Sequence, residues 1–239
     1  MVSAASDPPG AALNQSSPSR FLVSELLELL ESYLDTAQVK EIYSAYLFSA
    51  EAHEGQKRLS GEPYIYHPLA VAKIMAEMRM DGKSITAAIL HDVIEDTPTA
   101  KEHILEMFGA DVAHLVDGVS KLTHLKFPTR VEAQAENFRK MMLAMVHDIR
   151  IIVIKLADRT HNLRTIGVMP PDKRRRIAKE TIDIYIPIAH RLGMHKLRLE
   201  LERLAFEAMY PMRYKVLSDV VKKNRGNRKE VMREVEASI

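Results

Sequence analysis

Apolar residues recur at helical spacing along most of this chain, and no segment shows the strict alternation expected of a half-buried β-strand. The spacing begins at 21–30 and is most pronounced in the segment IRIIVIKLADRTHNL at 149–163, which should cross the core. Aromatic residues make up only 6% of the 239 residues, and Trp is absent, so side chains that favour strands are scarce. The sequence therefore predicts an all-α fold.

Breaks in this spacing predict the domain organisation. Residues 1–19 are rich in Ala, Ser, Pro and Gly without apolar periodicity, which is typical of a disordered tail. A helical domain follows at 20–210, and a more polar helical extension occupies 211–239. Within the domain, residues 124–134 look irregular and precede a helix at 135–147.

Helix boundary residues give more local predictions. Pro68 should be the first residue of a helix with His67 as its N-cap, and Ser84 should cap a helix that continues to Asp96. Pro187 should kink the helix that contains it. The pair at 225–226, Arg-Gly, interrupts the sequence pattern of the more polar final stretch.

Composition excludes several classes of site. The chain has no Cys, so His, Asp or Glu must hold any metal. No apolar run approaches the length of a membrane span and no signal peptide is recognisable, so we expect a cytoplasmic protein without membrane association. The 34 basic and 32 acidic residues are too balanced to predict nucleic-acid binding, and we interpret the basic run at 173–176 as a solvated helix face.

The segment LHDVIED is the strongest candidate for chemistry. His91 and Asp92 are adjacent, and Glu95 and Asp96 follow one helical turn later among apolar neighbours. Buried carboxylates are costly without compensation, and a cation would supply it. The alternative is a hydrogen-bonded His91-Asp92 pair followed by an exposed final turn.

Two further positions are candidates from their surroundings. Asp158 directly follows the most apolar stretch of the chain, although it could instead simply pair with Lys155 or Arg159. His67 follows a loop at 55–66 that contains two glycines, although it could instead be a capping or packed histidine.

Taken in order, His67, His91-Asp92 and Asp158 give the pattern H…HD…D, which resembles the HD superfamily of metal-dependent phosphohydrolases. Longer blocks resemble more specifically the hydrolase domain of the RelA/SpoT family, and its SpoT branch most closely, over about residues 20–232. These blocks are RLSGEPYIYHPLAVA, LHDVIEDT, FGADVAHLVDGVSKLT, AENFRKMMLAMVHDIRIIVIKLADRTHNLRT and IYIPIAHRLGMHKLRLELERLAFEAMYP.

The resemblance implies an HD-domain helical bundle of about ten or more helices. It also implies an enzyme that hydrolyses the 3′-diphosphate of (p)ppGpp to GDP or GTP and pyrophosphate, which ends stringent-response signalling. It implies Mn²⁺ held by four side chains, His67, His91, Asp92 and Asp158. Mixed nitrogen and oxygen ligands suit Mn²⁺ or Fe²⁺ better than Ca²⁺, and they also admit Zn²⁺.

The same resemblance assigns roles to residues around this centre. Glu95 and Asp96 would arrange the attacking water, and the substrate would be bound by Arg58, Ser60, Asn162, Thr165 and Ile166. Synthetase and regulatory domains are expected in the full-length protein, and this chain should carry out hydrolysis alone. Two alternatives stay open: an HD phosphohydrolase acting on other nucleotides, and a catalytically silent module that senses nucleotides.

Overall fold

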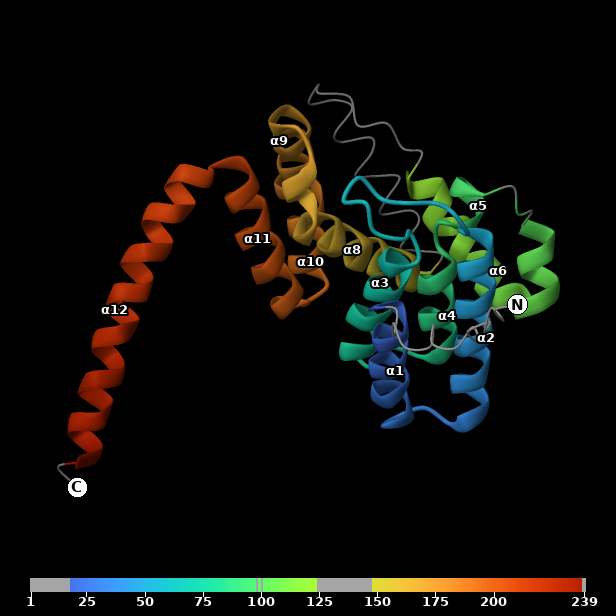
Figure 1. Ribbon diagram of the computed structural model, residues 1–239, viewed down its shortest axis with the longest axis horizontal. Coiled ribbons are helices and arrows are strands. Elements are labelled where there is room, and N and C mark those ends of the chain that lie inside the picture. Colours follow the sequence, from blue (N-terminus) through green and yellow to red (C-terminus); the bar gives the residue numbers. More distant parts are fainter. Residues whose placement is uncertain (1–17, 98, 100, 124–147, 238–239) are drawn as a thin grey trace, which may run out of the picture.

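The computed structural model describes residues 18–97, 99, 101–123 and 148–237 (Figure 1). Every regular element in these ranges is helical, apart from one bridge between Lys57 and Pro63, so the all-α prediction is confirmed. The elements are α1 (Pro18–Glu31), α2 (Thr36–Ala52), α3 (Tyr66–Glu77), α4 (Gly82–Leu90), α5 (Val93–Asp96), α6 (Lys101–Thr123), α8 (Ile149–Arg164), η1 (Ile166–Val168), α9 (Pro171–Glu180), η2 (Thr181–Tyr185), α10 (Ile186–Arg191), α11 (His195–Met209) and α12 (Pro211–Ala237).

Two helices form the centre of the fold. In α4, every residue from 84 to 90 is buried, because α2, α3, α6 and α8 all pack against it. In α8, the side chains at 151–158 are buried without interruption, as the apolar run predicts. Because α8 contacts α3 and α6 and also α11, it connects the N-terminal helices to the C-terminal ones (Figure 1).

The packing of α6 depends on two glycines. Gly109 has φ 82° and ψ 173°, so α6 consists of two helical segments that meet at a kink. Gly118 lies against α8: a Cβ placed on it would stand 3.0 Å from Cγ1 of Ile151 and closer still to its Cδ1. The backbone of α6 therefore approaches α8 too closely for a side chain at this position.

Two predicted boundaries near the candidate site are wrong. Because α3 begins at Tyr66, His67 is its second residue and not its N-cap. Pro68 costs no backbone hydrogen bond at this position, since the first N–H groups of a helix have no intrahelical acceptor. Asp81, not Ser84, caps α4 by accepting from the Ser84 N–H, and the helix ends at Leu90 instead of continuing to Asp96.

The C-terminal half has two positions where the sequence departs from a regular helical pattern. A π-helical turn, η2, precedes Pro187, with the Ile186 N–H bonded to Thr181 O five residues earlier, and the kink expected at Pro187 stays a prediction. The helix α12 runs through Gly226, where the sequence pattern is interrupted, since a single helical glycine costs only about 1 kcal/mol.

The remaining predictions concern segments and boundaries. Residues 1–17 of the predicted tail, and the loop and helix predicted at 124–147, lie outside the described residues. The domain boundary predicted at 210 and 211 stays a prediction, and α11 ends at Met209 where α12 begins at Pro211. Among the described helices, none combines the length and the apolar character needed to cross a bilayer.

Candidate metal centre and adjoining pocket

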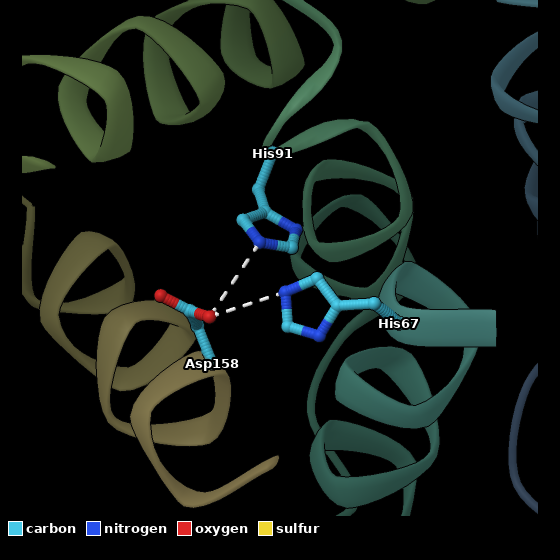
Figure 2. Close-up of side chains that lie close together, drawn as sticks. All are labelled: His67, His91 and Asp158. Carbon is cyan, nitrogen blue, oxygen red and sulfur yellow. Dashed lines mark ion pairs between the residues drawn. The ribbon is translucent and has the colours of Figure 1, made fainter. Parts of the chain in front are cut away.

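Three side chains from three separated parts of the sequence meet in the interior. His67 comes from α3, His91 from the end of α4 and Asp158 from α8, and one ligand atom from each lies within 4.8 Å of the others (Figure 2). Their exposed fractions are 2%, 0% and 5%. The three helices pack directly against one another, so the core itself holds the side chains in place.

The histidine rings are oriented for ligation. His91 Nδ1 lies 2.8 Å from Ala88 O, so it donates there, and its Nε2 is buried without a hydrogen-bond partner. His67 Nε2 lies 3.2 Å from Asp158 Oδ1, and His91 Nε2 lies 4.0 Å from the same oxygen. A buried imidazole nitrogen that faces carboxylates without a well-formed hydrogen bond to them suits a divalent cation with nitrogen and oxygen ligands.

Asp92 lies beside this group and contacts both histidines. Its Oδ1 is 3.1 Å from His91 Nε2, and its Oδ2 is 3.4 Å from His67 Nε2. It is not among the three residues whose atoms all lie within 4.8 Å of one another. The structure therefore brings three of the four predicted ligands into one group and places Asp92 at its edge, so the four-ligand set stays a prediction.

The charges of the site favour a bound cation. Burial opposes protonation of His91, but the carboxylates of Asp92 and Asp158 outweigh it and raise the pKa of His91 to about 9. Burial also disfavours the ionised form of Asp158, yet Lys155 and the two histidines hold the pKa of its carboxyl below the usual range. The metal-free site thus retains a proton where a metal would supply positive charge.

Tyr64 is a site residue that the sequence reasoning missed. Its hydroxyl lies 2.8 Å from Asp92 Oδ2 and 2.5 Å from Asp96 Oδ2, and its ring stacks on His53. Burial and the nearby carboxylates raise the pKa of Tyr64, so the hydroxyl stays a donor. Nothing in the loop sequence distinguishes Tyr64 from Tyr66, and only the packing of the loop against α5 reveals its position.

The residues predicted to arrange water lie on the short helix α5. Asp96 is exposed and accepts from Tyr64, while Glu95 is half-buried on the preceding position. The backbone carbonyl of Asp96 accepts from Gln56 Nε2 at 3.0 Å, which attaches α5 to the loop before α3. The Asp96 carboxylate is therefore held beside Asp92, although the helix that was predicted to carry all these residues is broken.

A pocket of about 250 Å³ adjoins the centre and is lined by Lys57, Arg58, Leu59, Ser60, Tyr64, Thr165, Val168 and Met169. Three of the predicted substrate residues, Arg58, Ser60 and Thr165, are in its lining. Asn162 lies behind Arg58 and accepts from its Nη2. Ile166 belongs to the hydrophobic core, with 7% of its surface exposed.

Known proteins that are similar in sequence give independent evidence about the family of this chain. A sequence model of the HD domain matches residues 45–195. The bifunctional (p)ppGpp synthase/hydrolase SpoT of Escherichia coli (strain K12) is 58% identical over 219 residues, which are 92% of this chain and 31% of that protein. A guanosine-3′,5′-bis(diphosphate) 3′-pyrophosphohydrolase of Vibrio cholerae shows the same identity and coverage. This chain therefore spans less than a third of the length of these curated relatives.

A more distant relative and a solved structure extend the comparison. A GTP pyrophosphokinase of Myxococcus xanthus is 49% identical over 192 residues, which are 79% of this chain and 25% of that protein. A solved structure described as a metazoan ortholog of SpoT that hydrolyzes ppGpp is 24% identical, with a TM-score of 0.57. It covers 73% of this chain and 96% of that one, and at this identity it supports the fold alone.

Proposed function

This chain belongs to the HD-domain family, and from that membership we propose that it hydrolyses the 3′-diphosphate of (p)ppGpp, releasing pyrophosphate and leaving GDP or GTP. The observation that carries the proposal is the buried meeting of His67, His91 and Asp158 beside a pocket lined by Arg58. The names of relatives that are 58% identical over 92% of the chain support the choice of substrate.

We assign the metal to His67, His91 and Asp158, with Asp92 as the fourth ligand, and we propose that it is Mn²⁺. Two imidazoles and two carboxylates suit this ion, and the buried Nε2 of His91, which faces Asp92 and Asp158, supports a ligand at that position. When bound, such a cation lowers the pKa of water and neutralises charge on phosphoryl oxygens.

The protein's own groups would complete the reaction. Water attacks the phosphorus bonded to the ribose 3′-oxygen. The bond between this phosphorus and the 3′-oxygen breaks, and pyrophosphate is released. Glu95 or Asp96 takes the proton from the attacking water, and the released 3′-oxygen gains a proton. The hydroxyl of Tyr64 keeps Asp96 close to Asp92, which supports these roles.

The substrate would occupy the adjoining pocket. Arg58 carries a planar guanidinium suited to a phosphate or to stacking on guanine, and Ser60 and Thr165 add hydroxyls to the lining. We also assign Asn162 and Ile166 to substrate recognition. Asn162 supports this because it bonds both Arg58 and Asp158, and so touches the pocket and the metal centre at once.

We further propose that residues 20–210 form the hydrolase domain, that it acts in the cytoplasm, and that 211–239 lead toward a synthetase region in the full-length protein. The support is that the Escherichia coli relative is named as both synthase and hydrolase, while this chain covers 31% of it. We assign hydrolysis without synthesis to the 239 residues.

The decisive experiment combines metal analysis with a ppGpp hydrolysis assay on the wild type and Asp92→Ala. We expect Mn²⁺-dependent release of pyrophosphate by the wild type. Turnover should fall by at least about 100-fold in the variant, because losing a residue that only hydrogen-bonds a metal ligand commonly costs 10- to 100-fold in activity, and losing a ligand itself costs more. Asp111→Ala is the matched control, since that exposed carboxylate pairs only at the surface with Lys83.

Three results would contradict the proposal. Retained turnover in Asp92→Ala would overturn the metal assignment. Faster hydrolysis of dNTPs or nucleoside monophosphates than of ppGpp would favour an HD phosphohydrolase of other nucleotides. Binding of ppGpp without turnover in the presence of Mn²⁺ would favour a silent sensing module.

A further inference from the structure

His161 joins the nucleotide pocket to the metal centre. Its Nδ1 lies 2.7 Å from Nδ1 of His67 and 3.2 Å from Nη1 of Arg58, and the two imidazole rings are 4.9 Å apart at 34°. A second branch runs parallel to the first, since Arg58 Nη2 donates to Asn162 Oδ1 and Asn162 Nδ2 donates to Asp158 Oδ1. One loop arginine is thus connected to two candidate metal ligands through adjacent residues of α8.

The hydrogen positions in the first branch follow from the chemistry of its members. A guanidinium only donates, so Nδ1 of His161 must accept from Arg58 and cannot carry a hydrogen. The 2.7 Å contact with Nδ1 of His67 can then be a hydrogen bond only if Nδ1 of His67 carries the hydrogen, so the arginine and His67 share the one lone pair of this acceptor. This leaves Nε2 of His67, 3.2 Å from Asp158 Oδ1, as the nitrogen available to a cation.

We propose that His161 is a positioning residue for the metal centre, holding the Nδ1 hydrogen of His67 in place and coupling Arg58 in the pocket to the metal ligand. The inference rests on the proposed metal-dependent function. It adds that metal and nucleotide binding are linked, because the partner that fixes the ligand also contacts the nucleotide-binding arginine. Such linkage is reciprocal, so each ligand should strengthen the binding of the other.

Two substitutions separate the acceptor from the ring. His161→Asn keeps an oxygen near the place of Nδ1, whereas His161→Phe keeps a ring of similar size and removes the acceptor. Calorimetric titration of the metal-free protein with Mn²⁺ alone should show affinity about 10-fold or more weaker in His161→Phe, the usual effect of losing such a partner. His161→Asn should stay within about 3-fold of the wild type on the same scale.

Controls distinguish this role from a structural one. His190→Phe changes an exposed histidine and should leave Mn²⁺ affinity unchanged. The thermal unfolding midpoint in EDTA should be similar for both His161 variants. Equal Mn²⁺ affinities in His161→Phe and His161→Asn, whether both normal or both weakened, would overturn the inference.

A spectroscopic test addresses the hydrogen itself. Long-range ¹H–¹⁵N spectra of the imidazole rings in the metal-free protein should show a hydrogen on Nδ1 of His67 in the wild type and in His161→Asn. In His161→Phe the hydrogen should no longer be fixed on Nδ1 of His67, so the spectra should show it shared between Nδ1 and Nε2. An unprotonated Nδ1 on His67 in the wild type would overturn the proposal whatever the enzymatic activity.

The coupling is tested with Arg58→Ala. This change should weaken Mn²⁺ binding in the wild-type background and have a smaller effect once His161 is Phe, because the connection is already broken. Equal effects in both backgrounds would show that Arg58 does not act through His161. A wild type that binds no Mn²⁺ would instead reject the proposed metal centre, so the two failures are distinguishable.

Discussion

Lys155 Nζ lies 2.8 Å from Asp158 Oδ2 within the same helix, while Oδ1 of the same carboxylate faces the two histidines. Both partners are buried, with side-chain exposures of 8% and 7%. One oxygen of Asp158 is thus held by a permanent cation, while the other, which also accepts from Asn162 Nδ2, faces the metal centre. The ion pair fixes the rotation of the carboxylate as well as its charge.

Replacing Lys155 with Met should destabilise the metal-free protein by about 3–5 kcal/mol, because Asp158 would remain buried without its cation. Saturating Mn²⁺ should restore part of this loss by supplying positive charge on the other side of the carboxylate. Urea unfolding in EDTA and in Mn²⁺ measures both effects.

Lys73→Met is the matched control, since Lys73 pairs with Glu25 at the surface, where such pairs contribute about 0–1 kcal/mol. A loss in Lys155→Met no larger than in this control would mean that Asp158 does not depend on its buried partner.

The raised pKa of His91 makes the stability of the metal-free protein depend on pH. A histidine whose pKa is raised on folding stabilises the protein fully below its ordinary value of 6.5, and this contribution is lost as the pH rises toward about 9. Mn²⁺ must displace the same proton, so its apparent affinity should increase over this window, by up to about tenfold per pH unit.

Calorimetric melting between pH 6.5 and 8.5, in EDTA and in Mn²⁺, measures both trends. His91→Gln should abolish the decline seen in EDTA. If the metal-free wild type showed no such decline, the carboxylates would not hold the proton on His91.

Tyr64→Phe should lower turnover of ppGpp about 10- to 100-fold and lower the free energy of unfolding by about 1.5–3 kcal/mol. The lost hydroxyl bonds two carboxylates, and a hydrogen bond to a charged group is worth about 1.5–3 kcal/mol. Steady-state kinetics at saturating Mn²⁺ measures the change, with Tyr43→Phe on the exposed face of α2 as the control. Equal kinetics in the two variants would remove Tyr64 from the site.

Gly118→Ala should destabilise the protein by about 1–3 kcal/mol, the usual range for overpacking, even though Ala favours helix formation by about 1 kcal/mol over Gly. The added methyl would meet Ile151 where α6 crosses α8. Gly167→Ala, whose Cβ would have nothing within 4 Å, should change the unfolding free energy by only a few tenths of a kcal/mol. Similar results for the two would show that α6 can move away from α8.

Sequence reasoning succeeded where one local signal decides the structure. Apolar spacing predicted that 149–163 crosses the core, and the side chains at 151–158 of α8 are buried. The absence of Cys predicted a nitrogen and oxygen site, the resemblance to the HD superfamily implied His67, His91 and Asp158 among its ligands, and the structure brings these three together.

It failed where tertiary packing decides. The break after Leu90 has no glycine or proline to announce it, and the position of Tyr64 depends on how its loop meets α5. Asp158 was expected either to pair with Lys155 or to bind the metal. In the structure one of its oxygens pairs with Lys155 and the other faces the histidines, so the two roles are compatible.

The π-helical turn of η2 decides which side chains reach Arg159. Its guanidinium bonds Glu180 and lies 4.3 Å from the ring centre of Tyr185, five residues further along. In a regular α-helix, residues five apart point about 140° away from each other, so a single group could not contact both. A one-residue deletion that turns η2 into a regular α-helical turn would place the two side chains four residues apart, about 40° from each other, and so keep both within reach of Arg159. The π-helical turn therefore lets this helix carry one extra residue without losing either contact beside Asp158.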